Sequence, residues 1–225
     1  MRIVSLCPSL TELVFALGRG NDLVGITRYC VHPEEGVRGV ERVGGTKNPR
    51  NARIIQLAPD LVLLNEEENR LEDARELEQA GLDCLSTFPK SAGETAGMVR
   101  LIARALRREE AGERIAREIE ERNLAAREAR GEEVSFAYLI WKNPWMSVNG
   151  DTYTSSLLVE AGGRNVFNAE EVRYPRVTPE DLRLKDPELV MLSSEPYHFT
   201  DEHRGELQEL TGLPLERFRL VDGEY

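Results

Sequence analysis

The sequence predicts an α/β protein: two small three-layer lobes, each with a mostly parallel sheet, joined by a long backbone helix. One observation is a repeat, since ARIIQLAPDLVLLNEE (52–67) and EDLRLKDPELVMLSSE (180–195) share a helical turn, then Pro-acid-Leu-Val and an apolar run that ends in acid. A short apolar run that begins at proline and ends in polar residues is typical of a buried parallel strand. The other observation is the helical composition of residues 91–130, between the two copies.

A second matching pair of segments precedes the two strands. PSLTELVFALGRGNDLVGI (8–26) predicts a helix with Ser9 and Glu12 as a capping box and Gly18 as its stop. One face of this helix is apolar, formed by Leu10, Leu13, Val14 and Leu17. TYTSSLLVEAGGRNVF (152–167) repeats the plan. Two matching pairs in the same order indicate two lobes of like design.

The helical segment sets the domain boundaries. We expect an N-terminal lobe over 1–89, a helical connection over 90–131 and a C-terminal lobe over 132–225. Within the connection, the spacing of apolar residues predicts a backbone helix over 109–130 with Gly131 as its stop. A helix of roughly 20 residues is about 30 Å long, enough to join two small lobes.

Composition excludes several classes of protein. The formal net charge of −11 disfavours nucleic-acid binding, which needs a basic surface. No run of about 18 apolar residues predicts a membrane span. Met1 leads directly into a strand-like segment, which argues against a signal peptide and leaves a cytoplasmic location open. The three cysteines lack CxxC spacing and are expected to be free thiols.

Several motifs resemble a known family. RIVSLCPSLTELVFALG, VGITRYCVHP and VGGTKNPRNARIIQLAPDLVLL resemble the N-terminal lobe of helical-backbone solute-binding proteins, which serve ABC importers of cobalamin, haem and ferric siderophores. WKNPWMSVNGDTYTSSLLVEAGGRNVF and RYPRVTPEDLRLKDPELVML match the second lobe. The chain looks most like the cobalamin-binding branch. The resemblance implies a periplasmic monomer and a further C-terminal helix beyond residue 225.

Polar residues at the strand ends suggest a ligand cleft. In open α/β sheets the crevice lies at the carboxyl ends of the strands, which places Asn65, Glu66 and Glu67 on one wall and Glu195 on the other. The alternative for these glutamates is a solvated turn whose carboxylates favour a helix start. In the first lobe, Tyr29 matches a cleft aromatic of the family.

Aromatic residues of the second half suit a flat ligand. Rings with a polar edge bind corrins or porphyrins through stacking and dispersion. The candidates are Trp141, Trp145, Tyr174 and Tyr197. The alternative is that at least one tryptophan packs in the core of the lobe.

The remaining candidates concern phosphate, metal and catalysis. Thr46 and Lys47 lie in a glycine-rich turn of the kind that can cradle phosphate, but the GxxxxGK[ST] pattern of nucleotide binding is absent. Both residues are predicted to contact the small-molecule ligand. A bare divalent metal bound by histidine and carboxylate is a competing hypothesis, although surface histidines are the simpler interpretation. Its candidate ligands are His32, His198 and His203. Cys7 could act as a nucleophile at a helix start, but no histidine base lies near it in sequence.

The sequence therefore predicts a ligand-binding protein rather than an enzyme, with no resident cofactor. The ligand is expected to be cobalamin-like, haem or a ferric siderophore. The resemblance implies a permease of an ABC importer as partner, with Glu72 and Glu202 as docking residues on the two lobes. The competing class is a cytoplasmic regulatory or interaction protein that kept the fold.

Overall fold

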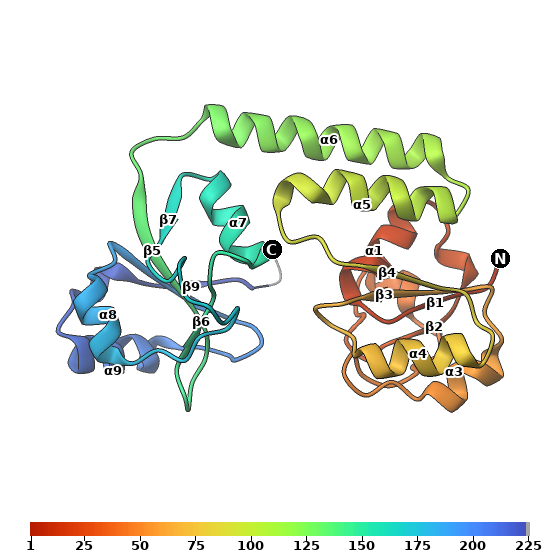
Figure 1. Cartoon of the computed structure of the whole chain (residues 1–225), viewed down its shortest axis with the longest axis horizontal. Helices are drawn as coiled ribbons and strands as arrows, with labels where there is room; N and C mark the ends of the chain where they lie inside the picture. Colours follow the sequence, from red (N-terminus) through yellow and green to blue (C-terminus); the bar gives the residue numbers. More distant parts are fainter. Residues whose placement is uncertain (224–225) are drawn as a thin grey trace. The chain divides into compact units, whose positions relative to one another are not determined.

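The computed structural model describes residues 1–223, and the chain divides into two compact units. The first unit contains Met1–Pro89 and Thr95–Ile119, and the second contains Lys90–Glu94 and the chain from Glu120 onward. The helical segment 90–131 is therefore shared between the units, with the boundary falling inside one long helix. Each unit has its own sheet (Figure 1).

The sheet of the first unit is entirely parallel. Its strands run in the order β2-β1-β3-β4. They are β1 (Ile3–Ser5), β2 (Leu23–Ile26), β3 (Leu61–Asn65) and β4 (Cys84–Thr87). The predicted buried strand at LVLL is β3, and its residues Leu61 to Leu64 are all buried.

Helices cover both faces of this sheet. They are α1 (Pro8–Ala16), α2 (Glu34–Val37), α3 (Asn51–Leu57), α4 (Leu71–Gln79) and α5 (Ala92–Ala105), with a 3₁₀ turn at Gly20–Asp22. Helix α6 (Glu109–Glu128) packs on α5. Ile3 and Leu63 pack with α1 and α5, whereas Val4 and Leu64 pack with α3 and α4. This alternation follows from the two-residue period of a strand. The result is three layers.

Two predicted helix ends differ from the structure. The capping box at Ser9 and Glu12 is wrong, because Cys7 occupies the N-cap and Pro8 the first helical turn. Proline is favoured there, since its fixed φ suits the helix and its missing N–H leaves no donor unpaired. Gly18 has a φ of +71° just after α1, as expected for a helix stop. Helix α6 ends at Glu128, two residues before the predicted end.

The second unit repeats the plan with one antiparallel edge. Its strands are β5 (Val134–Trp141), β6 (Met146–Ser147), β7 (Gly163–Asn165), β8 (Leu189–Ser193) and β9 (Phe218–Val221). Their order is β6-β5-β8-β9, and β7 also pairs with β5. Only the β5–β6 pair is antiparallel among these strands of the described chain.

Helices again lie on both faces of the sheet. They are α7 (Tyr153–Glu160), α8 (Pro179–Lys185) and α9 (Asp201–Thr211), with a 3₁₀ turn at Leu215–Arg217. Leu182 of α8 and Leu207 of α9 share one core with Leu139 and Leu192. Leu158 of α7 packs against Tyr138 and its neighbours on the other face. LVLL and LVML therefore lie in separate sheets, and the predicted fold class is confirmed.

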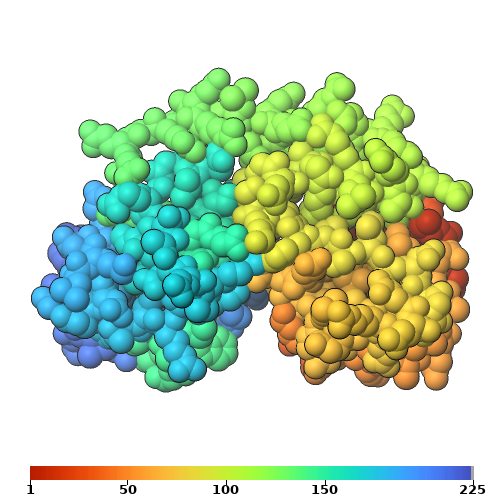
Figure 2. Space-filling model, viewed as in Figure 1, coloured from red at the N-terminus to blue at the C-terminus, as the bar shows by residue number. Residues whose placement is uncertain are grey.

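The long helix α6 packs on α5 through small residues. A Cβ atom at Gly112 would lie 2.2 Å from the Cβ of Ala103 in α5, so the two backbones approach closely. Arg100 of α5 binds Glu113 of α6 at 2.7 Å, and Arg117 binds the same carboxylate. The outer side chains of α6 are exposed along the helix (Figure 2). None of the helices in residues 1–223 has the length and apolar character of a membrane span.

Candidate functional site

In the first unit, the predicted aromatic residue lies on the surface. Tyr29 follows β2 and is 54% exposed. The guanidinium carbon of Arg28 lies 5.3 Å from the centroid of its ring. A cation at this distance attracts the ring face and limits its motion. Tyr29 therefore offers an exposed, partly ordered aromatic surface at the carboxyl end of the sheet.

The glycine-rich turn at residues 44–47 lies against the loop that follows β3. Gly44 has a φ of +116°, which only glycine adopts without strain. Thr46 is buried, with 8% of its surface exposed, whereas Lys47 is exposed. The Lys47 ammonium donates a hydrogen bond to the backbone carbonyl of Glu67. The turn therefore presents Lys47 at its surface and uses Thr46 in its packing.

A buried asparagine that the sequence did not single out joins three loops of the first unit. The Nδ2 atom of Asn69 donates to the carbonyl of Leu6 at 2.9 Å and to the carbonyl of Thr46 at 3.0 Å. Its Oδ1 atom accepts from the backbone N–H of Asn65 at 2.9 Å. Asn69 is 7% exposed, so each of these bonds satisfies a group that water reaches poorly. The signal for this role in the sequence is an amide side chain, which can both donate and accept hydrogen bonds, in the loop just after a predicted strand.

The acidic loop after β3 has a defined turn at its start. Asn65 accepts the backbone N–H of Glu67 on its side-chain oxygen at 2.9 Å, which is an Asx turn. Glu66 is exposed and Glu67 is half-buried. The structure therefore brings Thr46, Lys47, Asn65 and Glu67 together at one edge of the sheet.

In the second unit, three predicted aromatic residues belong to one cluster. Trp141 is the last residue of β5, is 40% exposed, and meets the ring of Tyr197 edge-on at 5.6 Å. Tyr197 in turn lies 4.8 Å from Phe199. Trp145 stacks on Phe199 with ring centroids 5.9 Å apart and an interplanar angle of 5°. Trp145 thus packs against the core, as the alternative interpretation of one tryptophan expected.

The structure separates Tyr174 from this cluster. Tyr174 is half-buried and packs with Tyr138 and Met191 on the opposite face of the sheet from Trp145. The guanidinium carbon of Arg173 lies 5.9 Å from its ring centroid. Glu195 is exposed in the loop after β8.

His203 contacts the aromatic cluster through one of its ring nitrogens and through its ring, and it contacts Thr200 through the other nitrogen. Its Nδ1 atom accepts the backbone N–H of Thr200 at 2.9 Å, and its Nε2 atom lies 3.1 Å from the hydroxyl of Tyr197. The imidazole also meets the rings of Tyr197 and Phe199 edge-on, at 5.4 Å each. Both ring nitrogens are therefore engaged, and the expectation of a solvated surface histidine is wrong for His203.

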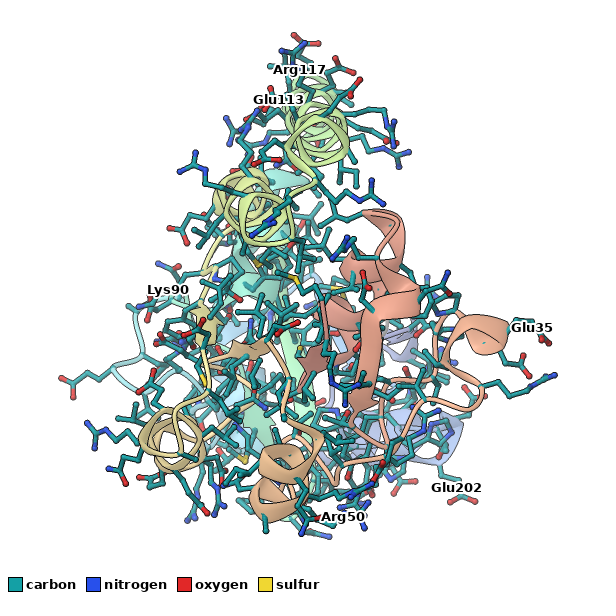
Figure 3. All side chains as sticks on the ribbon, turned by 90° about the vertical axis from the view of Figure 1, so that its right-hand side faces the viewer. Glu35, Arg50, Lys90, Glu113, Arg117 and Glu202 are labelled. Atoms are coloured by element: carbon teal, nitrogen blue, oxygen red, sulfur yellow. The ribbon has the colours of Figure 1, made fainter. Side chains whose placement is uncertain are left out.

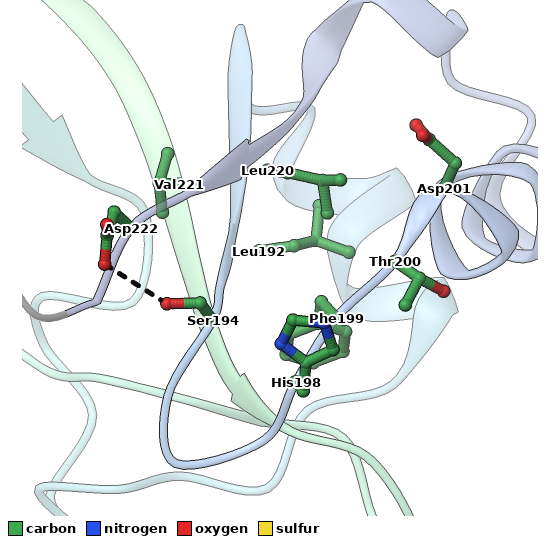
Figure 4. A pocket seen from close by; sticks show the side chains of 9 residues that line it. All are labelled: Leu192, Ser194, His198, Phe199, Thr200, Asp201, Leu220, Val221 and Asp222. Carbon is green, nitrogen blue, oxygen red and sulfur yellow. Dashed lines mark hydrogen bonds between the residues drawn. The ribbon is translucent and has the colours of Figure 1, made fainter.

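An open pocket lies beside this cluster within the second unit. Its volume is about 410 Å³, and its floor is apolar, with Leu192, Phe199 and Leu220 among its lining residues. His198 and Asp222 also line it, and Ser194 donates to Asp222 at 3.4 Å (Figure 4). The pocket mixes an apolar floor with polar edges.

The geometry gives little support to a bare metal site or a thiol nucleophile. Within residues 1–223, no group of three or more His, Cys, Asp or Glu side chains is arranged to hold a metal ion. His32 and His198 are exposed. Cys7 is buried, and burial raises its pKa, with the Ser9 hydrogen bond acting in the opposite direction. A thiol with a raised pKa is a poor nucleophile.

The two predicted docking glutamates occupy corresponding positions in the two units. Glu72 lies in the first turn of α4 and Glu202 in the first turn of α9. Both side chains are exposed, and Glu202 points away from the protein (Figure 3). Neither forms an ion pair within the part of the chain that the structure describes.

Comparison with known proteins decides the family. A family model described as periplasmic binding protein matches residues 3–212. The chain belongs to the periplasmic binding protein family. The vitamin B12-binding protein of Vibrio cholerae is 26% identical over 204 residues, which cover 90% of this chain and 71% of that protein. The vitamin B12-binding protein of Photorhabdus laumondii is 28% identical over 195 residues, 86% of this chain and 70% of that protein.

Solved structures of periplasmic binding proteins show the same fold. The periplasmic vitamin B12 binding protein BtuF of Vibrio cholerae superposes with a TM-score of 0.82 at 24% identity, covering 98% of this chain and 87% of that one. The periplasmic heme-binding protein RhuT of Roseiflexus sp. RS-1 has a TM-score of 0.83 at 24% identity, with coverages of 100% and 90%. The predicted family and the predicted role as a solute-binding protein for ABC importers are confirmed.

Proposed function

We propose that this periplasmic binding protein takes up a bulky, flat metal chelate of the cobalamin or haem type and delivers it to an ABC importer. The observation that carries the ligand class is the exposed ring of Trp141, held edge-on by Tyr197 at the carboxyl end of β5. An ordered aromatic edge binds flat apolar ligands with little loss of side-chain entropy. The names of the relatives, which include vitamin B12-binding and heme-binding proteins, support the same class.

Each unit contains its own candidate ligand-binding residues. In the first unit, Tyr29 supplies an aromatic surface and Lys47 a cation. In the second unit, Trp141 and Tyr197 supply the flat wall, with Trp145 behind them. The remaining candidates are Thr46, Asn65, Glu66, Glu67, Tyr174 and Glu195. We assign no catalytic role and no resident cofactor, and we propose that the protein acts as a periplasmic monomer.

Absorbance spectroscopy tests the ligand class. The purified protein is mixed with cyanocobalamin, haemin and a ferric hydroxamate chelate, and the bound fraction is separated by gel filtration. We expect one of the three to co-elute at a ratio near one to one and to quench tryptophan fluorescence. Elution of all three chelates apart from the protein contradicts the proposed ligand class, although the family assignment still holds.

The docking proposal concerns the permease. Glu72 and Glu202 are exposed carboxylates without ion pairs in the described chain, so each is available to a basic partner. An exposed ion pair contributes only about 0–1 kcal/mol, so two pairs act mainly on orientation and association rate. Replacing both by Lys should slow association with the cognate permease, most strongly at low salt, and leave ligand affinity unchanged.

Two other glutamates provide a matched control. Glu12 in α1 and Glu209 in α9 are also exposed, one in each unit, and their replacement by Lys changes the net charge equally. Equal slowing by both double variants would indicate a general charge effect and contradict docking at Glu72 and Glu202. Loss of ligand affinity in the Glu72→Lys, Glu202→Lys variant would place these residues in the ligand site instead.

A further inference from the structure

The hydrogen bonds of His203 fix which of its nitrogens carries the proton. A backbone N–H can only donate, so the Thr200 N–H at 2.9 Å requires a bare lone pair on Nδ1. A neutral imidazole with a bare Nδ1 has its proton on Nε2. The Thr200 hydroxyl lies at the same 2.9 Å from Nδ1 and can donate to it as well. The start of α9 therefore selects the Nε2–H tautomer.

This tautomer fixes the role of the Tyr197 hydroxyl. Nε2 lies 3.1 Å from the Tyr197 oxygen, so its N–H donates and the phenol oxygen accepts. A phenol has one proton of its own to donate. Within residues 1–223, His203 is the hydrogen-bond partner of this hydroxyl, and no side chain or carbonyl there accepts the phenol proton. Tyr197 is left as a donor without an acceptor.

The ring that carries this donor is held in place. The imidazole of His203 is half-buried and contacts the rings of Tyr197 and Phe199 at 5.4 Å, nearly perpendicular to both. Trp141 meets Tyr197 from another side at 5.6 Å. A ring with three aromatic neighbours loses little entropy when a ligand binds it. The donor is therefore oriented before the ligand arrives.

We propose that His203 is a specificity-determining positioning residue that makes Tyr197 a hydrogen-bond donor toward the ligand, so that the ligand group at Tyr197 is an acceptor oxygen. This inference rests on the proposed function and narrows its ligand chemistry. Amide carbonyls of a corrin and carboxylates of a porphyrin both supply such an oxygen. A ligand that offered only an N–H donor at this position would leave two donors facing each other, which is unfavourable.

A matched pair of variants separates this role from a structural one. Tyr197→Phe keeps the ring and removes the donor. His203→Glu keeps an acceptor for the Thr200 N–H, as in an ordinary capping box, but the new carboxylate also accepts the Tyr197 proton. In this variant the Tyr197 hydroxyl can only accept a hydrogen bond from the ligand, because its own proton is donated to the new carboxylate. Tyr138→Phe is the control, because it removes a hydroxyl that donates to Ser193 in the core.

Affinities for cyanocobalamin and for haemin give the ligand arm of the test. We expect Tyr197→Phe and His203→Glu each to weaken binding of the accepted chelate about three- to tenfold, the range of one neutral hydrogen bond. Adding Tyr197→Phe to His203→Glu should cause no further loss. If cyanocobalamin shows this pattern, the acceptor is an amide carbonyl; if haemin shows it, the acceptor is a carboxylate. Unchanged affinity in either single variant, with Tyr138→Phe also unchanged, overturns the inference.

Nitrogen-15 NMR of the ligand-free protein gives an independent arm. The long-range couplings of the His203 ring should show the proton on Nε2. A proton on Nδ1 overturns the inference even where the ligand data agree with it. Should neither chelate bind the unmodified protein, the proposed ligand class fails, while the tautomer still decides whether Tyr197 is a donor.

Discussion

The rings of Trp141 and Tyr197 meet edge-on, with centroids 5.6 Å apart, although 55 intervening residues separate them in the sequence. The contact joins the end of β5 to the loop after β8, and these strands are neighbours in the sheet. An edge-to-face pair of this kind contributes about 0.5–1.5 kcal/mol beyond the area that it buries. The two tryptophans of the chain differ in their surroundings, and their variants should therefore behave differently.

Trp141→Ala should mainly lower ligand affinity, by about 1–3 kcal/mol, because its ring is exposed and at the proposed wall. Trp145→Ala should mainly lower the free energy of unfolding, by about 2–4 kcal/mol, because its ring stacks on Phe199 in the core. Urea unfolding and ligand titration on both variants check this. The reverse pattern would move the ligand wall from Trp141 to Trp145.

Asn69→Ala should lower the free energy of unfolding of the first unit by about 2–4 kcal/mol, because it leaves the buried carbonyls of Leu6 and Thr46 without their donor. Asn69→Asp should not restore stability, since it keeps the acceptor for the Asn65 N–H but brings a carboxylate against those carbonyls. Asn21→Ala, at an exposed position, is the control. Wild-type stability in Asn69→Ala would show that water replaces the amide.

The sequence predicted those features that depend on local pattern. LVLL and LVML were identified as strands because a short apolar run that begins after proline is typical of a buried strand in an α/β protein. The start of α1 was predicted wrongly, because the pattern of Ser9 and Glu12 competes with the stronger preference of Pro8 for a first helical turn. Local rules give the element and leave its end uncertain by a residue or two.

Features that depend on contacts distant in sequence were harder to predict. Asn69 stands among glutamates, and such a segment is typical of a solvated turn. Its role depends on carbonyls at Leu6 and Thr46, 63 and 23 residues away. His203 had a local signal, since it lies three residues after Thr200 at the glutamate position of a capping box. Its bond to Tyr197 follows only once the loop is folded.

Acid should destabilise the second unit through Glu188. Its carboxylate accepts the Ser135 backbone N–H at 2.7 Å and the Ser135 hydroxyl at 2.9 Å, and the first of these is the main cause that lowers its pKa. Since the folded pKa lies below the unfolded one, the stabilisation is complete above the unfolded pKa and is lost as pH falls through the folded pKa.

Denaturant unfolding between about pH 7 and about pH 3 measures this effect. Glu188→Gln should unfold more easily at neutral pH and should lose less stability on acidification than the unmodified protein. Glu132→Gln removes the same charge from an exposed position and should follow the unmodified protein. Parallel pH profiles for the unmodified protein and Glu188→Gln would contradict the assignment.

Two glycines of the helical pair should respond in opposite directions to the same substitution. Gly112 lies in α6 where a Cβ atom would meet the Cβ of Ala103 at 2.2 Å, so Gly112→Ala must push α6 away from α5. Overpacking of this kind typically costs about 1–3 kcal/mol. Gly97 lies inside α5 with no atom within 4 Å of a Cβ built there. Gly97→Ala should therefore stabilise the protein by about 0.5–1 kcal/mol, because alanine favours the helix and restricts the unfolded chain.

Thermal unfolding of the Gly112→Ala and Gly97→Ala variants measures the sign of each change in stability. The ion pair of Arg100 with Glu113, which lies beside the contact, reports whether the two helices have moved apart. Arg100→Ala should cost less stability in the Gly112→Ala protein than in the unmodified one, because the separated helices already weaken this pair. Equal stabilisation by both glycine substitutions would show that α5 and α6 do not approach each other as closely as their backbones indicate.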